Sequence, residues 1–91
     1  MRIDKWSYQI LQKFFSNLEK KSPSQIIQEL QNPLTWNKIV WCMEWLPEKK
    51  QNMFIKKLEK LLKEKRILID VREKLIQCAL KNRVRIVNPW K

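Results

Sequence analysis

Apolar residues recur every three or four positions along most of the chain, which is the spacing of one face of an α-helix. Over residues 3–20 this stripe predicts a first helix, with Trp6 turned toward the core. The stripe consists of Ile3, Trp6, Ile10, Leu11, Phe14, Phe15 and Leu18.

The starts of the next two helices are marked by a capping residue followed by proline. The first turn of a helix tolerates proline because its amide groups have no partner within the helix. Ser22 precedes Pro23 and has Gln25 three residues later, the pattern of a capping box. Asn32 precedes Pro33 in the same way. The chain therefore predicts a short second helix from Pro23 and a third helix from Pro33.

The third helix, running to about Leu46, is apolar on two sides. Trp36 lies on the broader stripe, so we expect it in the core. Trp41 and Trp45 lie one turn apart on the other side. They either pack beneath a neighbouring helix, the interpretation we favour, or form an exposed pair for a protein partner.

Pro47 begins the longest predicted helix, which ends near Arg66. Its apolar positions, among them Phe54 and Leu58, fall on one side of the helix. Four lysines cluster within roughly 60° on the opposite side, a basic ridge on the order of 25 Å long. This lysine face consists of Lys49, Lys56, Lys60 and Lys63.

Beyond this helix, residues 66–69 are expected to form an extended connector, and the pair Asp70 and Glu73 offers a cap for a fifth helix that Asn82 ends. The tail over residues 83–91 alternates for a few positions and predicts an extended arm, whose pairing with the connector stays open. The expected fold class is all-α: a single domain over residues 1–91, a small four- or five-helix bundle with an extended C-terminal arm.

The positive charge is concentrated in the C-terminal half. Twenty Lys and Arg against nine Asp and Glu give a net charge of +11. Residues 48–91 carry fourteen basic and five acidic groups, a net charge of +9, whereas residues 22–47 have a net charge of −1. A segregated basic surface is typical of proteins that bind a phosphate backbone.

The candidate phosphate contacts are the lysine face together with Lys81, Arg83 and Arg85. Lysines one or two turns apart can neutralise neighbouring phosphates, and arginines add bidentate contacts. A face made of lysine does not read base edges, so we expect sequence-independent binding to RNA or single-stranded DNA. The alternative is a lysine face that is merely solvated.

The composition argues against catalysis. The chain has no glycine and no histidine, which removes glycine-rich phosphate loops, the usual general base and the commonest metal ligand. Cys42 and Cys78 are too few for a zinc site, and we expect buried thiols in a reducing compartment, with a single bridge as the alternative. No enzyme activity, cofactor, metal or small-molecule substrate is expected.

No apolar run exceeds five residues, so the sequence predicts neither a membrane span nor a signal peptide, and we expect a cytoplasmic protein. Binding to an anionic lipid surface is less favoured, because the apolar face of the lysine-rich helix has other helices to pack against.

Helices delimited by Pro23, Pro33 and Pro47, together with the lysine face, resemble the small helical subunit of multi-subunit CRISPR effector complexes. The resemblance covers most of the chain. It implies repeated copies that line an antiviral nucleoprotein complex and hold the nucleic-acid backbone without reading bases.

Trp41, Trp45 and Trp90 are the candidates for contacts with protein subunits of a larger complex. Trp90 alternatively anchors the tail or stacks on a base. The competing hypothesis for the whole chain is a protein-interaction module, an adaptor or inhibitor that binds an acidic partner.

Overall fold

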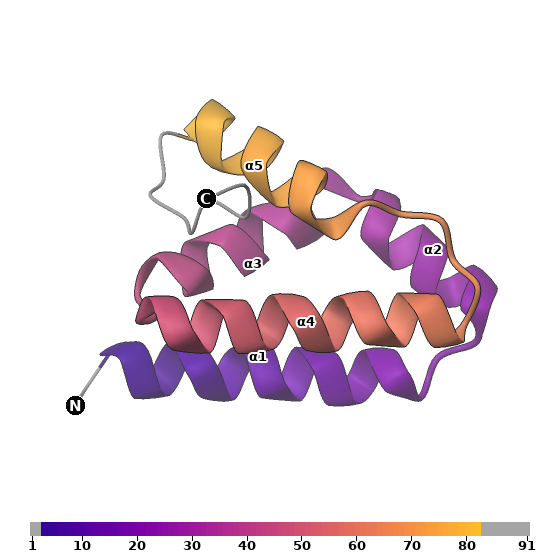
Figure 1. Ribbon diagram of the computed structural model, residues 1–91, viewed down its shortest axis with the longest axis horizontal. Helices are drawn as coiled ribbons and strands as arrows, with labels where there is room; N and C mark the ends of the chain where they lie inside the picture. Colours follow the sequence, from indigo (N-terminus) through magenta and orange to yellow (C-terminus); the bar gives the residue numbers. More distant parts are fainter. Residues whose placement is uncertain (1–2, 83–91) are drawn as a thin grey trace.

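The computed structural model describes residues 3–82 of the chain, and the expectations for the tail, including Arg83, Arg85 and Trp90, lie outside these residues. The all-α fold class is confirmed. The helices are α1 (Ile3–Glu19), α2 (Pro23–Gln31), α3 (Pro33–Glu44), α4 (Glu48–Glu64) and α5 (Val71–Asn82) (Figure 1).

The capping residues act as the sequence predicts. The Gln25 amide donates to Ser22 Oγ at 3.4 Å and the Ser22 amide donates to Gln25 Oε1 at 3.2 Å, which completes the capping box of α2. At α3, Asn32 Oδ1 accepts from the Leu34 amide at 3.0 Å. Pro47 precedes α4 as its cap residue, with the extended backbone typical of that position.

The end of α4 is closed by Arg66, whose φ is 59°. The Arg66 amide donates to the Lys63 carbonyl at 3.1 Å, and the Ile67 amide donates to the Leu62 carbonyl at 2.8 Å. These two bonds form a Schellman motif, in which a left-handed residue allows late carbonyls of the helix to find donors. Glycine usually fills this position, and its absence from the chain leaves arginine in a conformation that costs about 1 kcal/mol.

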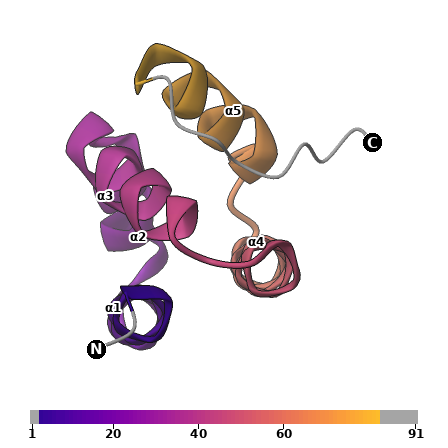
Figure 2. The ribbon, with the colours of Figure 1, turned by 90° about the vertical axis from the view of Figure 1, so that its left-hand side faces the viewer.

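Four helices surround the core, with α2 as a short connecting helix. Contacts join α1 to α3, α3 to α5, α5 to α4 and α4 to α1, and α2 packs on α3. Viewed from the end, the four long helices occupy the corners of a quadrilateral (Figure 2). The pair α1 and α4 lies side by side and runs in the same direction, whereas α1 and α3 run in opposite directions (Figure 1).

The core is built from the predicted apolar stripes, except that Trp6 lies outside it. Trp36 is 4% exposed, as predicted, and its indole Nε1 donates to the Leu30 carbonyl, which ties α3 to α2. The prediction that Trp6 lies in the core is wrong, because this side chain is 40% exposed. Its position falls at the edge of the α1 stripe, while Leu11 and Leu18 at the centre are buried.

A buried polar side chain links α3 to α4 through hydrogen bonds. Gln51 of α4 is buried and its Nε2 donates to the carbonyls of Met43 and Leu46, at 2.7 and 3.1 Å. Met43 lies in the last turn of α3, where its carbonyl also accepts from the Leu46 amide at 3.0 Å, and Leu46 follows the end of the helix. The Gln51 side chain at the start of α4 therefore provides hydrogen-bond donors to carbonyls at the end of α3.

The connector between α4 and α5 has no regular structure over residues 67–70, and Arg66, where the predicted extended segment began, is left-handed instead. Asp70 Oδ1 accepts from the Glu73 amide at 3.1 Å, so the predicted cap of α5 is present. Within the described residues no strand is formed, and pairing of the connector with the tail lies outside them.

Candidate nucleic-acid interface

The lysine face lies on the outward side of α4, and all four of its lysines are exposed. The opposite side of the helix is buried, with Phe54, Leu58 and Leu62 in the core. Because the apolar stripe fixes the rotation of α4, the lysines point into solvent along the length of the helix. This is the arrangement that the sequence predicts.

Two further lysines widen the basic surface toward α1. Lys50 Nζ lies 5.1 Å from the centroid of the Tyr8 ring, and Lys57 Nζ lies 5.3 Å from the centroid of the Phe15 ring. Both aromatic rings are half-buried between the helices. An ammonium group above a ring face is attracted by the ring quadrupole, which restrains these two lysines. Sequence reasoning missed them, since only the pairing of α1 with α4 brings each lysine to its ring.

The lysine face is not neutralised within the described residues. Two ion pairs occur there: Arg72 with Glu59 at 3.0 Å, and Lys21 with Glu29 at 3.1 Å. Glu59 belongs to α4, and Arg72 of α5 binds its carboxylate through two hydrogen bonds. The lysine face therefore keeps its charge available to an anionic partner.

Lys81 does not join this surface. It is exposed in the last turn of α5. Two views place the end of α5 away from α4, on the far side of the bundle (Figures 1 and 2). Of the predicted phosphate contacts that the structure describes, four therefore lie on α4, and Lys81 lies apart from them at the end of α5.

Three tryptophans form a second distinctive surface. The rings of Trp6 and Trp41 meet edge to face with centroids 5.6 Å apart, and those of Trp41 and Trp45 lie 6.4 Å apart. Trp41 is 46% exposed and Trp45 is 43% exposed, so the prediction that they pack into the core is wrong. The side of α3 that faces the core carries Trp36 and smaller side chains, and Trp41 and Trp45 lie on the other side. We call Trp6, Trp41 and Trp45 the tryptophan cluster.

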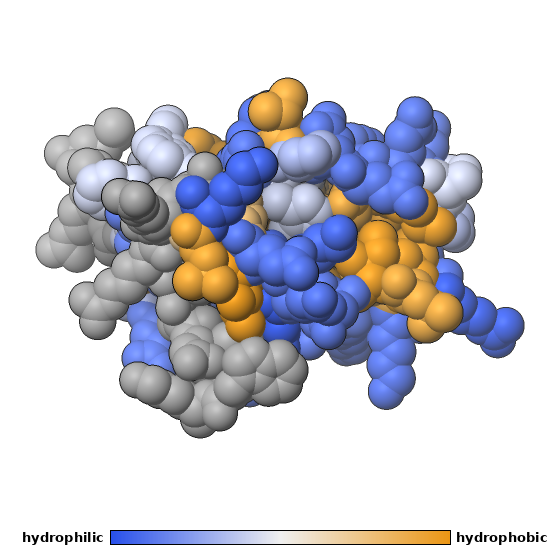
Figure 3. Space-filling view, turned by 90° about the horizontal axis from the view of Figure 1, so that it is seen from above, coloured by the Kyte–Doolittle hydropathy of each residue, from blue (hydrophilic) through white to orange (hydrophobic). Residues whose placement is uncertain are grey.

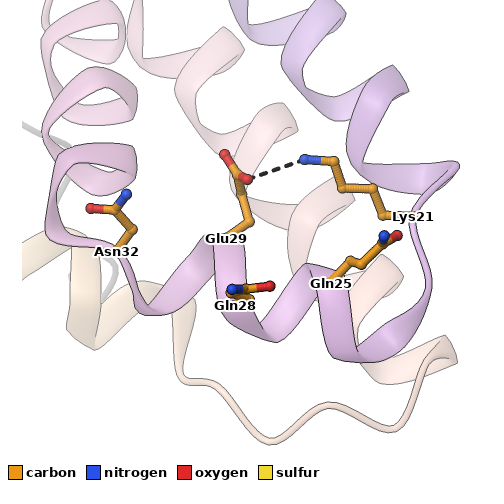
Figure 4. A pocket seen from close by; sticks show the side chains of 5 residues that line it. All are labelled: Lys21, Gln25, Gln28, Glu29 and Asn32. Atoms are coloured by element: carbon orange, nitrogen blue, oxygen red, sulfur yellow. Dashed lines mark hydrogen bonds and ion pairs between the residues drawn. The ribbon is translucent and has the colours of Figure 1, made fainter.

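Other parts of the described surface are less distinctive. From above, hydrophilic residues predominate, and apolar residues gather over part of α5 and toward the side where α2 and the connector lie (Figure 3). Leu68 of the connector is fully exposed. An open polar depression of about 380 Å³ lies beside α2 (Figure 4), and it holds the ion pair of Lys21 with Glu29. Its lining residues are Lys21, Gln25, Gln28, Glu29 and Asn32.

Cys42 and Cys78 are buried thiols, as the sequence predicts. Burial raises the pKa of the Cys42 thiol, which keeps it protonated and a poor nucleophile. Cys78 Sγ donates to Asn37 Oδ1 at 2.9 Å and so links α5 to α3. Within residues 3–82 no group of three or more His, Cys, Asp or Glu side chains is placed to hold a metal ion.

No described helix is both long enough and apolar enough to cross a membrane. The chain matches no family model, and neither the curated proteins nor the solved structures contain a match to it. The arrangement defines a basic helical bundle with a charged face on α4 and an aromatic surface between α1 and α3.

Proposed function

We propose that this protein binds the phosphate backbone of nucleic acid without sequence preference and without catalysis. The observation that carries the proposal is the lysine face: exposed lysines on one side of α4, with no acidic partner among the described residues. Neutralising phosphates with such cations releases condensed counterions, which favours binding at low salt.

The chemistry of the face supports backbone contact rather than base reading. Lysine presents a compact charge, whereas base edges are recognised mainly by the planar groups of arginine, asparagine and glutamine. Along an ideal helix, Lys56 and Lys60 lie about 6 Å apart and Lys56 and Lys63 about 10 Å apart. These spacings suit neighbouring phosphates, and they provide no contact that depends on the sequence.

We further propose that the protein acts as a subunit of a larger cytoplasmic nucleoprotein complex, such as the antiviral complexes whose small helical subunits it resembles. The tryptophan cluster supports this part of the proposal, because exposed aromatic side chains are enriched at the centres of protein interfaces. Buried cysteine thiols suit the reducing conditions of the cytoplasm.

Fluorescence anisotropy with labelled oligonucleotides at about 50 mM salt tests the proposal. The charge-reversal variant K56E/K60E/K63E should bind all sequences more weakly, and each lost contact should lower the salt slope by about 0.7 for single strands or 0.9 for duplexes. The matched control is K20E/K38E/K74E, which changes the net charge equally on exposed lysines of other segments. Absence of binding by the unmodified protein, or equal loss in both variants, would contradict the proposal.

A second candidate function is a protein-interaction module that binds an acidic partner. The specific observation in its favour is the exposure of all three members of the tryptophan cluster. In this case Trp41→Ala or Trp45→Ala should abolish partner capture without unfolding the domain, and nuclease treatment should have no effect. Capture that disappears with nuclease would favour nucleic-acid binding instead.

A further inference from the structure

The lysines of α4 form two rows rather than one. Lys49, Lys56 and Lys63 follow each other at intervals of seven residues on the outward side. Lys50 and Lys57 repeat the same interval one residue later, which places them roughly 100° further around the helix, toward α1. Lys60 lies between the rows. A row that continued to position 64 would meet Glu64, so the second row ends at Lys57.

The second row is restrained by α1. Tyr8 and Phe15 are also seven residues apart, and α1 runs in the same direction as α4, so each ring meets one lysine. Two equivalent lysine–ring pairs therefore repeat along the junction with a spacing of about 10 Å. Restraint of a long side chain before binding reduces the entropy that it loses on binding.

The separation of the two rows matches a groove of duplex DNA. A helix with its side chains is about 10–12 Å across, so cations on flanks roughly 100° apart lie on the order of 10 Å from each other. The major groove of B-form DNA is about 12 Å wide and has phosphates of opposite strands on its two edges. One row can reach each edge.

Within residues 3–82, the basic surface also lacks what single-strand binding requires. Proteins that hold single strands stack the bases on exposed aromatic side chains. The rings of Tyr8 and Phe15 are half-buried beneath lysines, and the tryptophan cluster lies toward α3, on the other flank of α1. In a duplex the bases are already stacked on each other, so no aromatic platform is needed.

We infer that the two lysine rows of α4 bind double-stranded DNA of the B form, with Lys49, Lys56 and Lys63 on one strand and Lys50 and Lys57 on the other. This inference rests on the proposed function and names its ligand. It favours a DNA duplex over the RNA or single-stranded DNA that the sequence predicts. A-form RNA duplexes, whose major groove is deep and narrow, fit the rows less well.

The test compares a labelled 20-base-pair DNA duplex, the same duplex in RNA and an oligo-dT strand by anisotropy over a series of salt concentrations. The unmodified protein should bind the DNA duplex most tightly. The variant K50Q/K57Q should lower the salt slope for DNA duplex by about 1.8, corresponding to two lost contacts, and should lower the slope for oligo-dT by a smaller amount. The control K20Q/K74Q makes the same change of charge on exposed lysines outside α4.

A rescue variant separates folding from binding. K50R/K57R keeps both the charge and the attraction to the rings, so it should retain duplex binding. Thermal melting of each variant identifies the temperatures at which all are folded. If K50Q/K57Q weakens duplex and single strand by the same factor, or if oligo-dT or the RNA duplex binds as tightly as the DNA duplex, the inference fails and the proposed function stands. If none of the three nucleic acids binds, the proposed function fails as well.

Discussion

The Trp6 ring of α1 meets the Trp41 ring of α3 edge to face, with ring planes 88° apart and centroids 5.6 Å apart. This contact joins the start of α1 to the last turns of α3 at the surface of the bundle, because both rings remain half-exposed. An edge-to-face pair contributes about 0.5–1.5 kcal/mol beyond the area it buries.

A double-mutant cycle measures this contact. Trp6→Leu and Trp41→Leu should each lower the free energy of unfolding, and the coupling between them should be about 0.5–1.5 kcal/mol in urea titrations. As a control, Trp6→Leu combined with Leu68→Ala should be additive, since Leu68 is fully exposed in the connector. A coupling below about 0.3 kcal/mol for the tryptophan pair would show that the contact is not stabilising.

Replacing Arg66 with glycine should stabilise the protein. Glycine adopts a positive φ without the steric cost that arginine bears, so we expect a gain of about 1 kcal/mol and a rise in Tm of about 4–8 °C. Lys65→Gly is the matched control, because Lys65 has a φ of −87° and gains nothing from glycine. Thermal melts followed by circular dichroism distinguish the two. Equal melting temperatures for Arg66→Gly and the unmodified protein would contradict the assigned left-handed conformation.

Ser7 has a buried hydroxyl with no hydrogen-bond partner among the described residues. Removing an unsatisfied buried hydroxyl relieves its desolvation penalty, so Ser7→Ala should raise the free energy of unfolding by about 1–2 kcal/mol. Ser16→Ala, at an exposed position of the same helix, reports the gain from helix propensity alone, about 0.5 kcal/mol. The prediction fails if urea denaturation gives the two variants the same stability.

Burial raises the pKa of the Cys42 thiol, and this makes stability depend on pH in a defined direction. The folded protein holds the thiol proton more tightly than the unfolded chain does. The associated stabilisation is therefore present below the unfolded cysteine value, about 8.5, and is lost as the pH rises through the folded pKa. We expect the free energy of unfolding to fall more steeply above about pH 8.5 in the unmodified protein than in Cys42→Ala. Parallel curves for the two proteins would contradict this expectation.

The local features of the fold could be predicted because their causes lie within a few residues of each other. Ser22 and Gln25 cap α2 as expected, and Asn32 with Pro33 begins α3. The lysine face is exposed because the apolar positions of α4 repeat with the helical period and fix its rotation. These results need no knowledge of which helices are neighbours.

The candidate site could be predicted only in part. Neither the Lys50 and Tyr8 pair nor the Lys57 and Phe15 pair is visible in the sequence, because each joins residues 42 positions apart on helices that happen to lie side by side. Lys81 belongs to the basic excess of the C-terminal half, but the direction of α5 carries it away from α4. A charge count says how many cations a segment holds, whereas their grouping depends on helix packing.

The sequence by itself determined that this chain forms helices, where most of them begin, and which side of α4 carries its lysines, because caps and helical periodicity are local properties. Only the tertiary structure decided that Trp6 joins Trp41 and Trp45 at the surface, and that α1 lies beside α4 and restrains a second row of lysines. The apolar stripe of a helix can be wider than the surface that its neighbours cover. Whether a residue at the edge of the stripe is buried then depends on how closely the next helix approaches.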